Sequence, residues 1–263
     1  MGRGIVNSLV ALGLGVVSLG CEGAAPVSDA SRPPIPSQVI DLSTVVGEDL
    51  PVRFWGHQVL TLFGFSDSTE FRHVEGETPY YFQNSFLTLF NHAGPHIDAP
   101  NHMERGAAGI DAFPLETFIG PLRVLDFRAG AVTEPIERTE FEGVGIQPGD
   151  VVVAFVGYTP PGPDGLPSFR HLSAEAAQYL ADLPVRLFGT DGLSVDGAAP
   201  PNAMGYEGNA PVHHAFLTRG IPVIEQLVNL EQVLEVDEPV FVGFPLRVAD
   251  GNASPIRAAA LVY

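Results

Sequence analysis

The segment from Asn91 to His102 contains the residues of this chain that are best suited to chemistry. It gathers His92, His96, Asp98 and His102, three of the chain's eight histidines and one aspartate, within eleven residues. Imidazole and carboxylate groups at this spacing are ligands that a divalent metal of the zinc type selects. A cluster of neutral imidazoles without a metal or a proton would leave polar groups unpaired. We therefore interpret the segment as a metal site, and the alternative is a set of purely structural histidines.

The backbone of this segment is expected to bend rather than to form a helix. Gly94 and Pro95 forbid a regular helix, so the two-histidine helical arrangement of a zincin does not apply. We expect a strand that ends in a tight loop and brings His92 and His96 to the same point. His96 and Asp98 lie two residues apart and would face the same side of an extended backbone.

A second polar group lies far downstream in the sequence. Glu225 ends the apolar run Ile221–Glu225, and a buried glutamate is costly unless it is paired or bound to a metal. His213 lies near the start of an expected helix, where the helix dipole disfavours a protonated imidazole. We therefore expect a neutral His213 that, together with Glu225, completes the histidine cluster across the fold. A salt bridge from Glu225 to an arginine is the alternative.

Short apolar runs separated by turn residues predict the strands that must position these groups. Most of the runs show little alternation, so we expect strands that are covered on both faces. The predicted strands are residues 39–42, 86–90, 122–127, 151–156, 185–188, 223–224, 240–244 and 257–262. Because strands outnumber helices, we expect an α/β domain around a mixed β-sheet.

The expected helices are fewer and are marked by their caps. Ser173 can cap a helix over residues 174–183, and a helix over residues 210–219 would end at Gly220. Asn229 can cap a short helix that runs through residues 232–234. Two long stretches rich in glycine and proline, residues 159–170 and 192–208, are expected to form walls or lids of a site.

Composition indicates a well-packed globular protein. The chain has 263 residues, of which 45% are hydrophobic and 17% are charged, and this is not the composition of a disordered chain. The formal net charge is −18, from 31 acidic and 13 basic residues, and every basic residue is an arginine. This balance disfavours binding to nucleic acid, because that affinity comes from basic side chains that neutralise phosphates.

Residues 1–20 are predicted to be a signal peptide. Arg3 precedes the apolar run Ile5–Leu19, which is too short to span a membrane comfortably. The only cysteine, Cys21, follows Gly20 at the end of this run and resembles the lipidation site of a bacterial lipoprotein, so we expect export and a lipid anchor at Cys21. An ordinary secretory signal is the alternative. Residues 21–37 predict a flexible tether, which leaves one catalytic domain over residues 38–263.

The histidine segment resembles the signature of the cyclase or kynurenine-formamidase family of metal-dependent hydrolases. That signature reads His-x-Gly-Thr-His-x-Asp-x-Pro-x-His, and residues 92–102 match it except at Pro95, which stands where the family has threonine. Further resemblance covers residues 40–43, 189–196 and 254–257, and the spacing of His213 and Glu225 also fits the family. The resemblance therefore spans nearly the whole of the expected domain.

This resemblance implies a fold, a cofactor and a set of ligands. The implied fold is an α/β, swivelling β/β/α-type single domain around a mixed β-sheet. His92 and His96 would bind a first metal ion and His213 a second, while Asp98 and Glu225 would bridge the two. The implied cofactor is a divalent metal, zinc first and manganese as the alternative, with two ions per chain. The implied assembly is a homo-oligomer, with a dimer expected first.

The resemblance also implies an activity. It is the hydrolysis of a small amide by a metal-activated hydroxide, with His102 as proton donor and acceptor rather than as a ligand. Aryl formamides such as N-formylkynurenine are the first expected substrates. From the residues themselves, Trp55 is an expected contact for an aryl group, with a core or dimer contact as the alternative, and His171 and Arg170 are expected to meet a substrate carboxylate. A cyclic amide or lactone hydrolase that resembles isatin hydrolase is one alternative. A non-catalytic lipoprotein that binds a metal or a small ligand is another, and His102 argues against it. The expected partners are a small-molecule substrate and, through the lipid anchor alone, a membrane.

Overall fold

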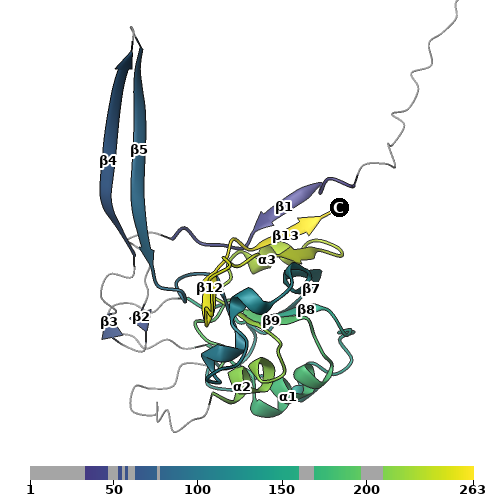
Figure 1. The fold of residues 1–263 in the computed structure, drawn as a ribbon. Helices are drawn as coiled ribbons and strands as arrows, with labels where there is room; N and C mark the ends of the chain where they lie inside the picture. Colours follow the sequence, from purple (N-terminus) through teal and green to yellow (C-terminus); the bar gives the residue numbers. More distant parts are fainter. Residues whose placement is uncertain are drawn as a thin grey trace, which may run out of the picture. The chain divides into compact units, whose positions relative to one another are not determined.

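A nine-stranded mixed β-sheet forms the body of the protein (Figure 1). The computed structural model describes residues 33–46, 53–54, 57–58, 63–75, 78–159, 169–196 and 210–263. Within this part of the chain, the residues from Ile35 to Tyr263 form one compact unit. The expected signal peptide and Cys21 lie outside the described residues. Among the helices that are described, none has the length and apolar character needed to cross a membrane.

Four parallel strands occupy the centre of the sheet. β7, β8, β9 and β10 pair in parallel, and the strands on both flanks pair antiparallel. The order from edge to edge is β1-β13-β11-β7-β8-β9-β10-β6-β12. In chain order, these strands are β1 (Gln38–Asp41), β6 (His96–Asp98), β7 (Ile119–Asp126), β8 (Val151–Phe155), β9 (Leu187–Thr190), β10 (Val223–Glu225), β11 (Val240–Val242), β12 (Ala253–Pro255) and β13 (Ala259–Val262). The predicted α/β domain around a mixed sheet is therefore confirmed.

Helices cover both faces of the central strands. α1 (Ala174–Asp182) follows β8 and α2 (Pro211–Leu217) follows β9, so each lies in the crossover between two neighbouring parallel strands. Alternate residues of β8 divide between two cores. Val152 and Ala154 pack with α1 and α2, whereas Val153 packs on the other face with α3 (Leu230–Val233). β8, β9 and β10 are buried on both faces and read as nearly unbroken apolar runs, as predicted. β7 differs from the prediction, because its residues alternate between exposed and buried over much of its length.

The two helix caps predicted from side chains have different outcomes. The Ser173 hydroxyl accepts a hydrogen bond from the Ala176 N–H at 3.2 Å, so it caps α1 as predicted. Asn229 precedes α3, but its side chain makes no cap. Its backbone is left-handed, with φ of 59°, and its amide donates to the Asp41 carbonyl at 2.7 Å. The cap prediction for Asn229 is therefore wrong, because its backbone is left-handed instead of extended and its side chain is turned to β1.

Two further strand pairs do not belong to the nine-stranded sheet. β2 (Arg53–Phe54) pairs with β3 (His57–Gln58), and β4 (Phe63–Glu75) pairs antiparallel with β5 (Thr78–Leu89). The predicted strand over residues 86–90 is the end of β5, which leads directly into the histidine segment. No strand is predicted for β4, because polar and charged residues interrupt its apolar ones. Short 3-10 helices fill the connections at Pro100–His102 (η1), Ile110–Ala112 (η2), Leu115–Phe118 (η3) and Arg138–Glu140 (η4).

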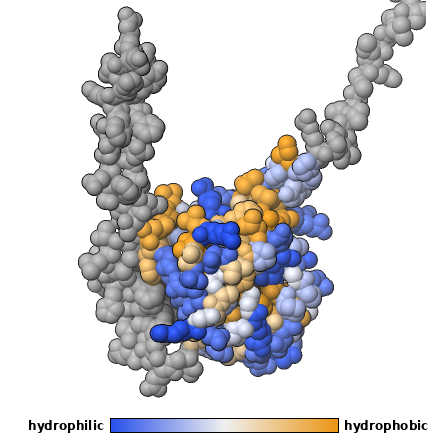
Figure 2. All heavy atoms as spheres, in the orientation of Figure 1, coloured by the Kyte–Doolittle hydropathy of each residue, from blue (hydrophilic) through white to orange (hydrophobic). Residues whose placement is uncertain are grey.

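The surface of the described body is largely hydrophilic on the face drawn in Figure 2, with apolar patches near its upper edge. Three large apolar side chains that follow β11, Phe244, Leu246 and Val248, are exposed. The hydrophilic surface agrees with the formal net charge of −18.

Candidate metal centre

Two short strands, β6 and β10, bring three predicted metal ligands to one face of the sheet. They pair antiparallel, with His96 opposite Glu225 and Asp98 opposite Val223. Side chains two residues apart share a face of a strand, so His96, Asp98 and Glu225 point to the same side. Val223 packs with α1 and α2 on that side. The register of one strand pair therefore joins two segments that are far apart in the sequence.

His92 reaches the same point through a tight turn. Gly94 has a left-handed backbone, with φ of 62°, which glycine adopts at no steric cost. The Gly94 carbonyl lies 2.8 Å from His96 Nδ1 and so turns the other ring nitrogen, Nε2, towards the carboxylates. Pro95 is buried, and its carbonyl accepts a hydrogen bond from the Ile256 N–H at 2.9 Å. The turn between β5 and β6 has the tight form that the sequence predicts.

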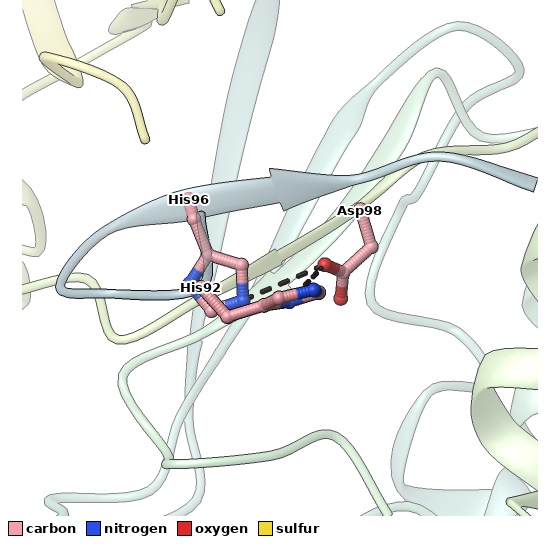
Figure 3. Close-up of side chains that lie close together, drawn as sticks. All are labelled: His92, His96 and Asp98. Atoms are coloured by element: carbon pink, nitrogen blue, oxygen red, sulfur yellow. Dashed lines mark ion pairs between the residues drawn. The ribbon is translucent and has the colours of Figure 1, made fainter. Parts of the chain in front are cut away.

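His92, His96 and Asp98 face one another in Figure 3. His92 Nδ1 lies 2.9 Å from Asp98 Oδ1, and His96 Nε2 lies 3.5 Å from the same oxygen. Across the strand pair, His96 Nε2 lies 3.5 Å from Glu225 Oε2. His213, on α2, places its Nε2 at 3.4 Å from Asp98 Oδ2 and at 3.2 Å from Glu225 Oε1. The fold therefore brings together all five residues predicted to bind metal.

Several polar atoms of this cluster are buried and receive no hydrogen bond from any residue that the structure describes. They are Nε2 of His96 and both carboxylate oxygens of Asp98, and the short approach of His92 is not aligned as a hydrogen bond. Buried polar atoms without partners are costly, and a bound cation would satisfy them. Two overlapping groups, His92 with His96 and Asp98, and Asp98 with His102 and His213, each hold their ligand atoms within 4.8 Å of one another. This donor set suits a divalent metal, and Asp98 belongs to both groups.

Carboxylates control the protonation of the histidines. Burial acts to lower the pKa of His213, but Glu225, Asp196 and Asp98 raise it well above its ordinary value. Burial acts in the same way on His96, and Asp98 and Glu225 raise its pKa as well. Burial would raise the pKa of Glu225, but His213 and His96 lower it to about 2. The prediction of a neutral His213 is therefore wrong for the metal-free protein, because three full carboxylate charges outweigh a dipole end that is worth about half a charge.

The salt bridge considered as an alternative for Glu225 is not found. Among the described residues no arginine pairs with this carboxylate, and its partners are His96, His213 and the Val195 N–H at 2.9 Å. The Val195 contact leaves the carboxylate facing the two imidazoles.

His102 lies beside both groups of ligand atoms, at the end of η1. Its ring centroid is 4.6 Å from that of His92 and 5.6 Å from that of His213. Burial lowers the pKa of His102 below its ordinary value of 6.5, although the charge of Asp98 opposes this. The imidazole is therefore neutral at neutral pH and able to accept a proton, as its predicted role requires. The same position would also allow it to bind metal, and the two roles predict different effects of removing the ring.

Asp196 contacts His213 and is not among the predicted site residues. Its carboxylate lies 2.5 Å from His213 Nδ1 and also accepts hydrogen bonds from the backbone N–H groups of Val212 and His213. The only signal for Asp196 in the sequence is its place at the end of the segment 189–196, which resembles the family.

Of the other predicted residues, His171 is described, and it is not part of the two groups of ligand atoms. Trp55 lies outside the described residues, as does Cys21. His171 is half-buried ahead of α1, and its Nδ1 has no hydrogen-bond partner among the described residues, so its contact with substrate stays a prediction. Arg170 is buried and bonds the Glu140 carboxylate at 2.9 Å and three backbone carbonyls. Arg170 therefore holds the fold together and is not free to meet a substrate.

A cavity of about 490 Å³ lies near the carboxyl ends of β8 and β9. Its walls include Phe155, Tyr158, Asp191 and Gln226. The Gln226 amide donates to the His92 carbonyl at 3.4 Å, so this wall touches the histidine segment. Among the described residues that line this cavity there is no candidate metal ligand, so the cavity lies beside the metal centre.

The sequence matches known proteins over most of the described domain. A family model described as "Putative cyclase" matches residues 40–197. A protein from Salinibacter ruber named kynurenine formamidase is 33% identical over 178 residues, which cover 65% of this chain and 76% of that protein. A protein of the same name from Delftia acidovorans is 32% identical over 179 residues, which cover 66% of this chain and 78% of that protein.

Solved structures share the fold at lower sequence identity. Isatin hydrolase A from Labrenzia aggregata superposes with a TM-score of 0.63 at 22% identity, covering 86% of this chain and 93% of that one. A structure described as a potential metal-dependent hydrolase with cyclase activity superposes with a TM-score of 0.60 at 24% identity, covering 86% of this chain and 98% of that one. At these identities the likeness concerns the fold.

Proposed function

This chain belongs to the cyclase family, and we propose that it is a metal-dependent hydrolase that cleaves aryl formamides of the N-formylkynurenine type. Its similarity to proteins named kynurenine formamidase supports a hydrolase that acts on amide C–N bonds. The observation that carries the metal dependence is the set of buried atoms of His96 and Asp98 that have no hydrogen-bond partner. Removing a carboxylate from water without a partner is costly, and these atoms converge on the other candidate ligands.

Five side chains would hold the metal. His92, His96, Asp98, His213 and Glu225 supply imidazole nitrogens and carboxylate oxygens, the donors that zinc and similar ions bind. Asp98 approaches all three of these histidines and Glu225 approaches two of them, so each carboxylate would be able to bind both ions. A bound divalent metal would lower the pKa of a water to ~7 and polarise the substrate carbonyl. We propose two ions per chain, with zinc as the first candidate.

His102 would move the proton during the reaction. Its burial keeps the imidazole neutral at neutral pH, so it can accept a proton from the attacking water. The protonated ring then donates to the nitrogen of the breaking C–N bond, because an amine is a poor leaving group without a proton. The amide and water become a carboxylic acid and an amine, and His102 ends in the state in which it began.

A first experiment measures metal content and turnover together. The domain over residues 38–263 is purified without added metal and without chelator, and its metal is counted by elemental analysis. N-formylkynurenine and isatin are then offered separately. We expect close to two ions per chain, and release of formate and an aryl amine from the formamide.

The outcomes separate the competing functions. Turnover that is abolished by chelation and restored by metal supports the proposal. Ring opening of isatin without cleavage of the formamide would replace it with a cyclic amide hydrolase. A chain that takes up no ion, or that binds metal and hydrolyses neither compound, would refute the catalytic proposal.

The cellular location and the assembly are also proposals. Residues 1–20 and Cys21 have the pattern of an exported lipoprotein, so Cys21→Ser should move the full-length protein from the membrane fraction to the soluble fraction of a bacterial host. An unchanged partition would argue against lipid attachment. We propose a homodimer, which light scattering would detect, and a monomeric mass would refute it.

A further inference from the structure

We propose that Asp196 is a positioning residue that fixes the tautomer and the direction of His213, so that the Nε2 atom of this ring is the one presented to the metal centre. The same carboxylate fixes the start of α2, the helix that carries His213. This inference rests on the proposed function only in that His213 binds metal. It assigns Asp196 a role in metal binding and not in the chemical step.

One carboxylate makes three contacts with two consecutive residues of α2. Asp196 Oδ1 accepts a hydrogen bond from the Val212 N–H at 2.7 Å, and Oδ2 accepts one from the His213 N–H at 3.1 Å. Oδ2 also lies 2.5 Å from His213 Nδ1. The Asp196 side chain is only 12% exposed, so water competes little for these contacts. The residue and the ring it contacts are seventeen positions apart in the chain.

The contact with Nδ1 determines which nitrogen of His213 can bind metal. An ionised carboxylate only accepts hydrogen bonds, so Nδ1 must carry a hydrogen. The lone pair available for a metal is then on Nε2, which lies 3.4 Å from Asp98 Oδ2 and 3.2 Å from Glu225 Oε1. A hydrogen bond from Nδ1 to a carboxylate also makes the imidazole more basic, so its Nε2 lone pair binds a metal more strongly.

His96 shows the same arrangement with a different acceptor. Its Nδ1 lies 2.8 Å from the Gly94 carbonyl, and its Nε2 also faces Asp98 and Glu225. A backbone carbonyl is neutral, whereas Asp196 carries a charge, and charge-assisted hydrogen bonds are roughly twice as strong as neutral ones. We therefore expect His213 to depend more on its acceptor than His96 does.

The helix that carries His213 also depends on this carboxylate. Ala210, the residue before α2, makes no side-chain cap. Asp196 instead satisfies two of the N–H groups that the first turn of a helix leaves without partners. The position of α2 and the direction of the His213 ring are therefore set by one group, and a change at Asp196 alters both.

The direct test is the tautomer of His213 in the zinc-loaded protein. Long-range nitrogen–proton correlation spectra of the 15N-histidine-labelled protein report which ring nitrogen is protonated, and the His213 signals are assigned by their loss in His213→Gln. We expect a protonated Nδ1 and a metal-bound Nε2. The reverse pattern would overturn the proposal, and this measurement does not require any Asp196 variant to fold.

The second test is the metal affinity of Asp196→Asn. The amide keeps the size of the side chain and one acceptor for the helix, but it loses the charge. We expect the zinc Kd to rise by about 10- to 100-fold, the range for residues that hydrogen-bond a metal ligand without contacting the metal. The matched control is Asp182→Asn, an exposed carboxylate at the end of α1 that bonds Gln178 and Arg219, and we expect no change in its Kd.

The results separate this proposal from the proposed function. Wild-type zinc affinity in a folded Asp196→Asn protein would overturn the positioning role. A protein that binds zinc through Nε2 of His213 but hydrolyses no amide would leave the positioning role standing and refute the proposed function. A wild-type chain that takes up no metal would refute the metal-dependent function itself and, with it, this inference.

Discussion

Metal loading should displace protons from the two histidines that the carboxylates hold charged. In the metal-free protein the pKa of His213 is well above its ordinary value and that of His96 is above 6.5. At pH 6.5 both imidazoles are therefore mainly protonated. Both must release the hydrogen on Nε2 before that atom can bind an ion. Asp98 and Glu225 release none, because their pKa values are lowered and they are already ionised.

These protonation states set the size of the effect. Loading the centre at pH 6.5 should therefore release protons from both His213 and His96. Each displaced proton changes the overall binding constant about tenfold per pH unit, which is ~1.4 kcal/mol. The sign follows from competition: affinity falls as pH falls, and it stops rising once pH exceeds the pKa of His213 in the metal-free protein.

Calorimetry can count these protons. Zinc is titrated into the metal-free domain at pH 6.5 in buffers that differ in ionisation enthalpy and do not bind the metal, and the slope of the observed enthalpy gives the number released. His213→Gln should lower the count by about one. His214→Gln removes the exposed neighbouring ring on α2 and should leave the count unchanged. An enthalpy that is the same in every buffer, or an affinity that does not vary between pH 6 and pH 8, would refute this account of the site.

Three further substitutions test the roles of single side chains. His102→Ala should keep the wild-type metal content and lose about 10²- to 10⁴-fold in kcat, and an equal loss of metal would make His102 a ligand. Phe216→Ala removes a fully buried ring that stacks on Phe188 at 4.8 Å, and should lower the free energy of unfolding in urea by about 3–5 kcal/mol. A loss of unfolding free energy below about 1 kcal/mol would contradict this prediction and would mean that the core repacks to fill the cavity. Arg257→Ala breaks an exposed pair with Asp41 and should leave the urea midpoint nearly unchanged in the same assay, so a clear drop in the midpoint would contradict its assignment as a surface contact.

Local spacing was enough to predict one half of the metal centre. His92, His96 and Asp98 are close in the sequence, and a glycine turn followed by a strand is enough to make them converge. His213 and Glu225 are different, because only the pairing of β10 with β6 and the packing of α2 bring them near. Spacing along the chain carries no information about that pairing, and these two residues were predicted from the cost of burying a glutamate, from the helix position of His213 and from the family resemblance.

The errors also have physical causes. The charge of His213 was predicted from the helix dipole alone, whereas its protonation depends on carboxylates that come from other elements. Asn229 has the residue type of a cap, but its amide bonds the Asp41 carbonyl instead. β12 was not predicted, because a three-residue edge strand that includes Ser254 and Pro255 has no apolar run. In each case a contact distant in sequence outweighs a local preference.

The position of β6 inside the sheet makes metal content a measure of correct strand alignment. This three-residue strand is held between β10 and β12, and both partners fix the same register. A slip of one residue would turn His96 and Asp98 to the opposite face and put Ile97 beside Glu225. Such a chain would keep most of its sheet and its apolar cores but could not assemble the centre. The fraction of molecules unable to load metal would therefore report misaligned folding that circular dichroism or a melting curve would not detect.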